Sequence, residues 1–479
     1  MTGAAPAKRR ISRAVMAAYG FGAVAYGVKD SGFGTFLLLF YNQVVGLPSA
    51  TVGAVIMAAL VIDAFVDPAV GFASDRTRSR WGRRHPWMYA SALPIMVAYY
   101  LLWNPPAGQA ALVWLFVCAV VVRTAVSCYE VPSVALTPEL SSDYDERTRI
   151  MAWRYLFGWA GGLGVGLLAW AVFLAPRAGE RTGMLNREGY ADYALASALL
   201  MGIAILVSAI GTHREIPKLP QPEIQKQRLR DLFADLLQTL RNRAFAILLL
   251  AGLCTYTNQG IAYALGNYLN GFVWGLTSRD FSILTVCFLL SATAAFVIAP
   301  RLGERGSKAR IAATVVVLGA LIGTTHYWLR VAGLAPAPGT REAVVLAIVC
   351  PIIGTAFNIT GFILGASMMA DVVEDSEDKT GRRSEGLFFA GAFFVQKCTS
   401  GVGIFVSSLM LAAAGFPDKA VPGQVPAATL DRLSLIYAVT YVCLALVAAF
   451  IFTRFPFGRD EHEARLARLA GNPAPGALG

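Results

Sequence analysis

Long apolar runs separated by short polar loops make up most of the chain. Each run reaches about 20 residues, the length that a helix needs to cross the hydrocarbon core of a bilayer. The runs lie at 14–44, 50–74, 87–103, 110–138, 150–174, 193–212, 244–274, 281–300, 309–332, 342–370, 386–415 and 431–453. They predict an all-α membrane protein with twelve transmembrane helices, because a helix satisfies its own backbone hydrogen bonds in lipid.

The longest polar stretch, 213–243, divides the twelve runs into two sets of six. Leucines and one phenylalanine recur at helical spacing from Leu229 to Leu240, which predicts an amphipathic helix on the membrane surface or a linker helix packed on the bundle. The expected domains are an N-terminal six-helix bundle at 1–212, a cytoplasmic central loop at 213–243, a C-terminal six-helix bundle at 244–454 and a cytoplasmic tail at 455–479.

Composition supports a membrane protein and argues against nucleic acid as a partner. Hydrophobic residues make up 56% of the 479 positions and charged residues 15%, which is too apolar for an ordinary soluble protein. The net charge of +11 arises from basic clusters in alternate loops, whereas the loops at 43–49 and 104–109 carry no basic residue. Basic loops remain on the cytoplasmic side, so we expect an inner-membrane protein with both termini in the cytoplasm.

The motifs reveal no catalytic or metal-binding arrangement. All seven cysteines lie in apolar runs without a CxxC pair, and we expect them to be small core residues. The four histidines form no HExxH motif, and no GxSxG nucleophile motif is present. We therefore predict that the chain is not an enzyme and has no organic cofactor. The basic start shows no small-residue cleavage site, so we expect no cleavable signal peptide.

Two acidic residues interrupt the second apolar run. Asp63 and Asp67 stand four positions apart and therefore share one face of a helix. An ionised acid in hydrocarbon costs about 3 kcal/mol, so such acids face the bundle interior and serve an ion or substrate path. Na+ and H+ are their natural ligands, because hard ions prefer oxygen donors. The structural alternative is that Arg123, Arg154 or Lys397 neutralises each acid.

The loop after this run carries a distinctive order of residue types. From Gly71 to Arg84 the sequence reads GFASDRTRSRWGRR, which resembles the loop between the second and third helices of the major facilitator superfamily. A loop of this kind can lock the cytoplasmic side by ion pairing between the two halves. The predicted gating residues are Asp75, Arg76, Arg83 and Arg84.

Five segments extend this resemblance over nearly the whole chain. They are YGFGAVAYGVKDSGFG from Tyr19, VVGLPSATVG from Val44, DAFVDPAVGFASDRTRSRWGRRHPW from Asp63, YEVPSVALTPEL from Tyr129 and FFVQKCTSGVG from Phe393. They resemble the glycoside-pentoside-hexuronide cation symporter family, the group of melibiose permease. The resemblance implies a major facilitator fold of two pseudo-symmetric six-helix bundles, alternating access, and sugar uptake coupled to Na+, H+ or Li+. Animal sodium-dependent lysolipid symporters resemble the same family, so the fold leaves the substrate open.

The resemblance also assigns roles to individual residues. Asp63 and Asp67 match the family's cation-binding acids, and Ser127 stands where a threonine binds the cation. Glu130 takes the place of a sugar-binding aspartate. Arg154 and Lys397 match basic residues that face the cavity.

Two positions depart from the pattern of the sugar carriers. Val66 replaces an asparagine that helps surround Na+, so the loss of this oxygen leaves H+ a rival coupling ion. Tyr26 and Gly27 replace a Lys-Asp pair, and the chain's own pair, Lys29 and Asp30, follows three residues later. Three residues are nearly one helical turn, so Asp30 can reach the same cavity at a different depth.

Apart from the family, the candidate cavity lining suits a polyhydroxylated ligand because it combines flat aromatic faces with hydrogen-bonding groups. The candidates are Tyr26, Asp30, Tyr129, Glu130, Trp153, Arg154, Asn258, Asn267 and Lys397. Arg123 stands seven residues before Glu130 on the same helical face, and we interpret it as the ion partner of Glu130. Five glycines between Gly158 and Gly166 predict close helix contact.

The sequence thus favours a secondary symporter that couples Na+ or H+ to a sugar or glycoside. Two halves around a central ionisable cluster suit a carrier better than a channel. A lysolipid symporter of the same fold and a transporter-like sensor are the alternatives. We expect a monomer in the lipid bilayer whose partners are a small-molecule substrate and the coupling ion.

Overall fold

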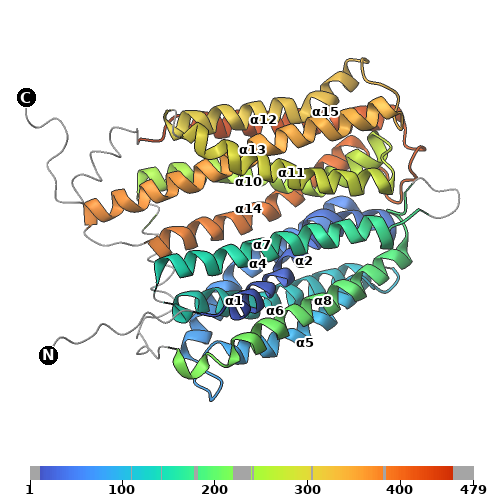
Figure 1. Cartoon of the computed structure of the whole chain (residues 1–479). Helices are drawn as coiled ribbons and strands as arrows, with labels where there is room; N and C mark the ends of the chain where they lie inside the picture. Colours follow the sequence, from blue (N-terminus) through green and yellow to red (C-terminus); the bar gives the residue numbers. More distant parts are fainter. Residues whose placement is uncertain are drawn as a thin grey trace, which may run out of the picture. The chain divides into compact units, whose positions relative to one another are not determined.

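The computed structural model describes residues 11–108, 110–141, 143–176, 182–219, 239, 242–303, 306–380 and 385–456 (Figure 1). These residues form twelve long helical segments that overlap the twelve predicted runs, and ten of the described helices are long and apolar enough to cross a membrane. The first segment comprises α1 Arg13–Phe21, α2 Ala23–Ser31, η1 Gly32–Phe36, α3 Leu37–Leu39 and η2 Phe40–Val45. The others are α4 Ser49–Arg76, α5 His85–Leu102, α6 Ala110–Leu140, α7 Tyr144–Leu168 with η3 Ala169–Phe173, α8 Arg187–His213, α10 Arg243–Tyr268 with η5 Leu269–Val273, α11 Ser278–Gly303, α12 Lys308–Val331, α13 Arg341–Thr380, α14 Glu385–Ala414 and α15 Ala427–Phe452.

The chain divides into two compact units. The first unit comprises Met1–Pro48 and Ala54–Leu229, and the second comprises Ser49–Gly53 and Arg230–Gly479. The amphipathic helix predicted between Leu229 and Leu240 lies outside the described residues, apart from position 239, as does most of the tail from 457 onward.

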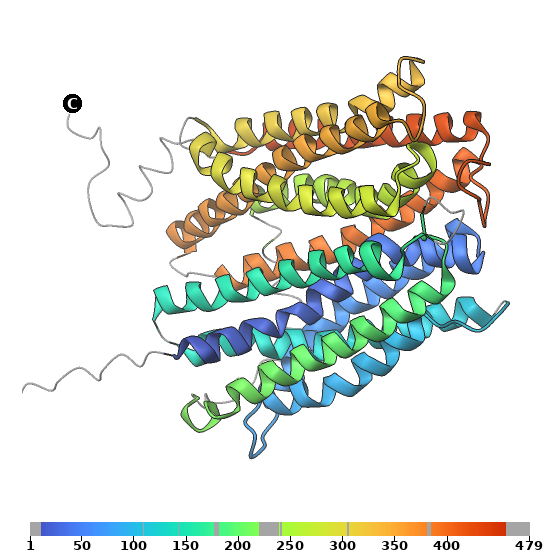
Figure 2. The same ribbon diagram turned by 45° about the vertical axis from the view of Figure 1, so that its right-hand side comes forward.

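In the first unit, the opening helical segment packs into a bundle with α7 and α8. Both α1 and α2 contact α7 and α8, and α5 contacts α6 and α8, so these helices run side by side in both views (Figures 1 and 2). Glycines bring α2 and α7 together: a Cβ added at Gly27 would lie 2.0 Å from the Gly158 carbonyl oxygen. A Cβ at Gly161 would lie 2.9 Å from Val24 Cα. Small residues thus permit close backbone approach here, as the glycine spacing predicts.

Glycine also permits close helix contact in the second unit. α10 packs on α14 and α15, and α12 packs on α13 and α15. A Cβ added at Gly403 of α14 would lie 2.6 Å from the Thr257 carbonyl oxygen of α10. α10 and α14 are the first and fifth long segments of this half, so they correspond to the α2 and α7 pair. The same pair of helices is therefore joined through glycine in each half.

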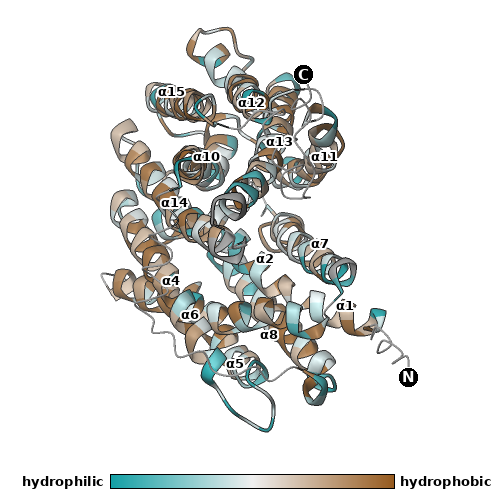
Figure 3. Cartoon of the chain, turned by 90° about the vertical axis from the view of Figure 1, so that its left-hand side faces the viewer, coloured by the Kyte–Doolittle hydropathy of each residue, from teal (hydrophilic) through white to brown (hydrophobic). Residues whose placement is uncertain are grey.

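Apolar side chains cover the outside of the helices as well as the core. Phe65, Leu93 and Phe450 are each more than half exposed, and brown ribbons extend over most helices, whereas the loop before α5 is teal (Figure 3). Outward apolar side chains face lipid in a membrane protein. This corrects the expectation that every cysteine is a core residue, because Cys443 is exposed on α15. An apolar run by itself does not separate core from lipid-facing positions.

Candidate ion and substrate site

One face of α6 organises the polar interior of the first unit. Arg123, Ser127, Glu130 and Ser133 follow one another at steps of three or four residues, so they form one row along the helix. Each half of this row engages a different neighbouring helix. Arg123 and Ser127 bind Asp63 of α4. Glu130 and Ser133 bind Arg154 of α7.

Asp63 is held by two donors from α6. The Arg123 guanidinium donates to Asp63 Oδ2 at 2.7 Å, and the Ser127 hydroxyl donates to Asp63 Oδ1 at 2.8 Å. Both partners of the ion pair are buried, with side chains 4% and 3% exposed. The Phe33 ring centroid lies 5.3 Å from the guanidinium carbon, a cation–π distance. Protein groups therefore already neutralise this carboxylate.

Glu130 pairs with Arg154 rather than with Arg123. Arg154 Nη2 donates to Glu130 Oε1 at 2.7 Å, and Nη1 donates to Ser133 Oγ at 2.6 Å. The predicted Arg123–Glu130 partnership is therefore wrong. Seven residues rise about 10.5 Å along a helix, so residues on one face can stand too far apart to pair. Side chains from the crossing helices α4 and α7 come closer.

Only one of the two carboxylate oxygens of Glu130 has a hydrogen-bond partner among the described residues. Its side chain is 24% exposed, and Oε2 is buried without a hydrogen-bond partner among the described residues. The Arg154 guanidinium also lies over the Tyr19 ring, 5.1 Å from its centroid, and Tyr19 donates to the Ser133 carbonyl. A fixed cation, an aromatic face and a carboxylate oxygen without a hydrogen-bond partner therefore lie close together here.

A second charged group lies on α2. The Lys29 ammonium is 3.6 Å from Asp30 Oδ1 and 4.1 Å from the Tyr26 ring centroid. Lys29 is 5% exposed, whereas Asp30 is 57% exposed. Tyr26 lies within electrostatic reach of Asp30, Glu130 and both members of the Asp63–Arg123 pair. Tyr26, Asp30, Glu130 and the Asp63–Arg123 pair therefore form one electrostatic cluster, together with Lys29.

The remaining predicted residues occupy varied surroundings. Asp67 is half-buried one turn beyond Asp63 and lies within electrostatic reach of Cys128 on α6. Trp153 is half-buried and stacks on Phe157, with ring centroids 5.7 Å apart. Lys397 is half-buried on α14 in the second unit, so its approach to the cluster stays a prediction.

Three other candidates for the cavity lining are buried in helix contacts. Tyr129 is 0% exposed and donates to Ser208 Oγ at 3.0 Å, and Asn258 of the second unit donates to the Tyr441 carbonyl at 2.9 Å. Asn267 is 4% exposed. In the described structure, Tyr129 and Asn258 join helices.

Two of the predicted gating residues, Arg83 and Arg84, bind Glu139, which the sequence reasoning missed. Arg83 donates to Glu139 Oε1 at 2.6 Å, and Arg84 contacts the same oxygen at 3.0 Å. Arg84 also lies 2.5 Å from Asp75 Oδ1, whereas Arg76 packs over the Phe72 ring at 3.4 Å. These ion pairs join elements of the first unit, so a lock between the two halves stays a prediction. The signal for Glu139 was its place in the quoted segment YEVPSVALTPEL.

The second unit carries a matching ion pair. Lys308, the first residue of α12, donates to Asp371 of α13 at 2.9 and 3.0 Å. In the first unit, Arg84 before α5 pairs with Glu139 near the end of α6 in the same way. In each half, a basic side chain at or just before the start of the third long segment thus pairs with an acid on the fourth. This equivalence gives structural support to a repeated half.

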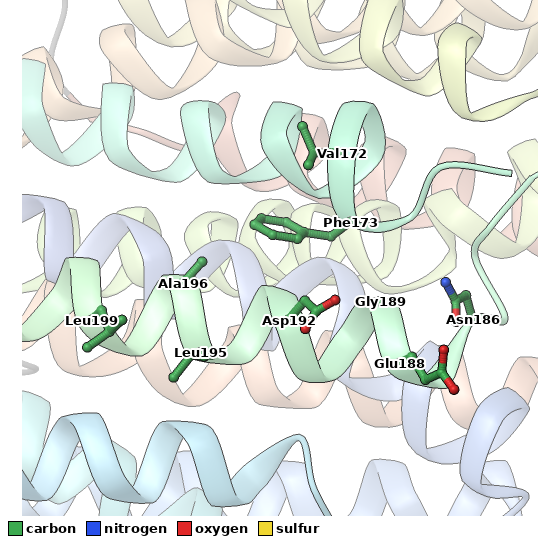
Figure 4. Close-up of a pocket in the computed structure, with 9 residues that line it drawn as sticks. All are labelled: Val172, Phe173, Asn186, Glu188, Gly189, Asp192, Leu195, Ala196 and Leu199. Carbon is green, nitrogen blue, oxygen red and sulfur yellow. The ribbon is translucent and has the colours of Figure 1, made fainter.

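A cavity of about 510 Å³ lies elsewhere in the first unit, between η3 and the start of α8 (Figure 4). Glu188, Asp192 and Asn186 supply its polar groups, and Leu195 and Leu199 continue the lining along α8. It includes no residue of the cluster on α6. The charged cluster, rather than this cavity, contains the predicted site.

Comparison with known proteins identifies the family. A model described as MFS/sugar transport protein matches residues 18–459. The chain belongs to this family. It is therefore a multi-pass membrane transport protein of the major facilitator fold and not an enzyme, as the sequence predicts.

Individual relatives differ in their named substrates. The chain is 26% identical to the isoprimeverose transporter of Lactiplantibacillus pentosus, over 80% of this chain and 76% of that protein. It is 24% identical to sodium-dependent lysophosphatidylcholine symporter 1-A of Danio rerio, over 93% and 86% of the two chains. The structure of the E. coli xylose transporter XylE superposes with a TM-score of 0.59 at 13% identity, over 93% and 99% of the chains. That low identity supports the fold alone.

Proposed function

We propose that this protein is a symporter that couples one cation to the uptake of a sugar or glycoside by alternating access. The observation that carries the proposal is the charge balance in the predicted spans of the first unit. Four carboxylates stand there against three cations, namely Asp30, Asp63, Asp67 and Glu130 against Lys29, Arg123 and Arg154. One further positive charge, from a bound ion or a basic side chain such as Lys397, completes the balance.

The substrate side of the proposal rests on Glu130 and its surroundings. The Oε2 atom has no hydrogen-bond partner among the described residues and can accept a hydroxyl hydrogen, and Arg154 holds the carboxylate in place. Tyr26 and Trp153 offer aromatic faces, and Asp30 offers an exposed carboxylate. These groups suit a polyhydroxylated ligand, in line with the isoprimeverose transporter among the relatives.

A lysolipid or related amphiphile is the second candidate substrate. It is favoured by the relative named as a lysophosphatidylcholine symporter, which matches over most of both chains. The charge balance argues for a coupling cation with either substrate. The two differ in the apolar area that the ligand must bury.

For location, we propose an inner-membrane protein that acts as a monomer, with cytoplasmic termini and Lys397 facing the substrate path. Asp75, Arg76, Arg83 and Arg84 would act at the cytoplasmic gate. The basic loops support this orientation.

The direct test is counterflow in proteoliposomes of the purified chain. Labelled glycosides and lysolipids would be offered separately, with Na+ or pH gradients imposed. We expect accumulation of one glycoside class, driven by one ion gradient, and its loss in Glu130→Gln. Absence of counterflow for both classes would favour a sensor, and accumulation of lysolipid alone would select the second candidate.

A further inference from the structure

We propose that Arg123 is a built-in counter-ion of Asp63. It takes the place that Na+ would occupy at this carboxylate, so the carrier is coupled to protons rather than to sodium. The inference rests on the proposed symport and names its coupling ion. It starts from the observation that both oxygens of Asp63 already accept hydrogen bonds. Arg123 donates to one oxygen at 2.7 Å and Ser127 to the other at 2.8 Å.

The Arg123 charge is permanent and fixed in an apolar setting. A guanidinium stays protonated in proteins at any accessible pH. Its side chain is 4% exposed, Phe33 covers it at 5.3 Å, and its Nε atom is buried without a hydrogen-bond partner among the described residues. A cation arriving at Asp63 would therefore meet a positive charge that water screens poorly.

The α4 face that carries Asp63 also supplies few oxygens for a metal ion. Hard metal cations gather about six or more oxygen ligands. On α4 the positions three and four residues from Asp63 are Ala59, Leu60, Val66 and Asp67, of which only the last supplies a side-chain oxygen. In the part of the chain that the structure describes, no three His, Cys, Asp or Glu side chains gather to hold a metal. A proton needs a single carboxylate oxygen.

The Asp63–Arg123 contact then has a structural task. It joins α4 to α6, and it engages the carboxylate oxygens that a Na+ ion at Asp63 would need.

The test compares ion-dependent stability of the full-length protein in detergent and in nanodiscs. Melting temperatures would be measured in NaCl and in choline chloride of equal ionic strength, at pH 6 and pH 8. For the wild type we expect equal melting temperatures in the two salts. Arg123→Gln removes the tethered charge and adds an amide oxygen, and we expect it to gain a Na+-specific rise of several degrees.

Two variants serve as matched controls. Arg154→Gln removes another buried guanidinium of the first unit, one that does not contact Asp63 in the described structure, and Arg123→Lys preserves the charge at Asp63. Both should stay indifferent to Na+. If Arg123→Gln does not fold, the wild type still decides: a Na+-specific rise in its melting temperature, or saturable ²²Na+ binding, would overturn the proposal.

The ion measurements need no substrate, so their result tests the role of Arg123 separately from the proposed symport. Absence of counterflow with any substrate would reject symport while the Na+ response still tests Arg123. Conversely, uptake driven by a Na+ gradient at constant pH would retain symport and reject the role of Arg123. Uptake driven by a pH gradient alone would support both.

Discussion

The charged residues of the α6 row, Arg123 and Glu130, are each paired with an opposite charge from a neighbouring helix. Arg154 is 4% exposed and Glu130 24% exposed, and their contact is 2.7 Å. Removing one partner of a buried pair leaves the other charge uncompensated, which costs about 3–5 kcal/mol, whereas removing both is far cheaper. The sequence analysis identified these residues but paired Glu130 with Arg123 instead of Arg154. Periodicity along α6 does not show which side chain of another helix faces each residue.

This asymmetry predicts the outcome of a double-mutant cycle. Glu130→Gln and Arg154→Gln should each lower the free energy of unfolding by about 3 kcal/mol. The double variant should lose clearly less than the sum, since no unpaired buried charge remains. Denaturant unfolding in detergent measures all three values. Additive losses would show that the two side chains do not interact.

Ser127 is the second residue whose role can be isolated. Ser127→Ala removes the donor to Asp63 Oδ1 and should cost about 1.5–3 kcal/mol, the range for a hydrogen bond to a charged group. Ser127→Thr retains the hydroxyl and should unfold nearly as the wild type does. Equal destabilisation by both substitutions would point to packing rather than to the hydroxyl.

At the scale of elements, helix contacts through glycine are the feature that both halves share. The sequence predicts the helices because each apolar run must satisfy its backbone within lipid. It also predicts close contact for the glycines between Gly158 and Gly166. It does not say which of them touches a neighbour. Gly162 faces Gly27, whereas an added Cβ at Gly164 would meet nothing within 4 Å.

This difference gives a matched pair of substitutions. Gly27→Ala should destabilise by about 3 kcal/mol or more, because the new Cβ would lie 2.0 Å from the Gly158 carbonyl and force α2 and α7 apart. Gly164→Ala should be neutral or stabilise by up to about 1 kcal/mol through helix propensity. Thermal unfolding of the two variants checks the contrast. Equal effects would mean that α2 and α7 can separate without cost.

The charge pairs at the helix ends differ in exposure between the two units. Arg84 and Glu139 are 6% and 7% exposed, whereas Lys308 is 30% exposed beside Asp371 at 8%. We expect the Lys308–Asp371 coupling to weaken more between low and high salt, since screening acts mainly on exposed charges. Double-mutant cycles for both pairs at 0.05 and 0.5 M salt measure this. A larger salt effect on Arg84–Glu139 would contradict the reasoning.

For the whole molecule, the charge pattern of the loops predicts the orientation in the membrane. The exposed loop around Ser79 should be cytoplasmic, and the exposed loop around Ala107 should lie on the opposite side. A membrane-impermeant maleimide added to right-side-out vesicles should label Ala107→Cys and spare Ser79→Cys until the membrane is permeabilised. Labelling in the reverse order would invert the topology and exclude Asp75, Arg83 and Arg84 from a cytoplasmic gate.

The sequence by itself determined the helical membrane fold, the division into repeated halves and the set of charged residues in the interior. It could do so because the bilayer imposes length and polarity on each segment separately. The tertiary structure decided the pairing: Arg123 with Asp63, Arg154 with Glu130, and Glu139 with the arginines before α5. Such pairs depend on the depth at which neighbouring helices cross, and no periodicity within one helix encodes that depth.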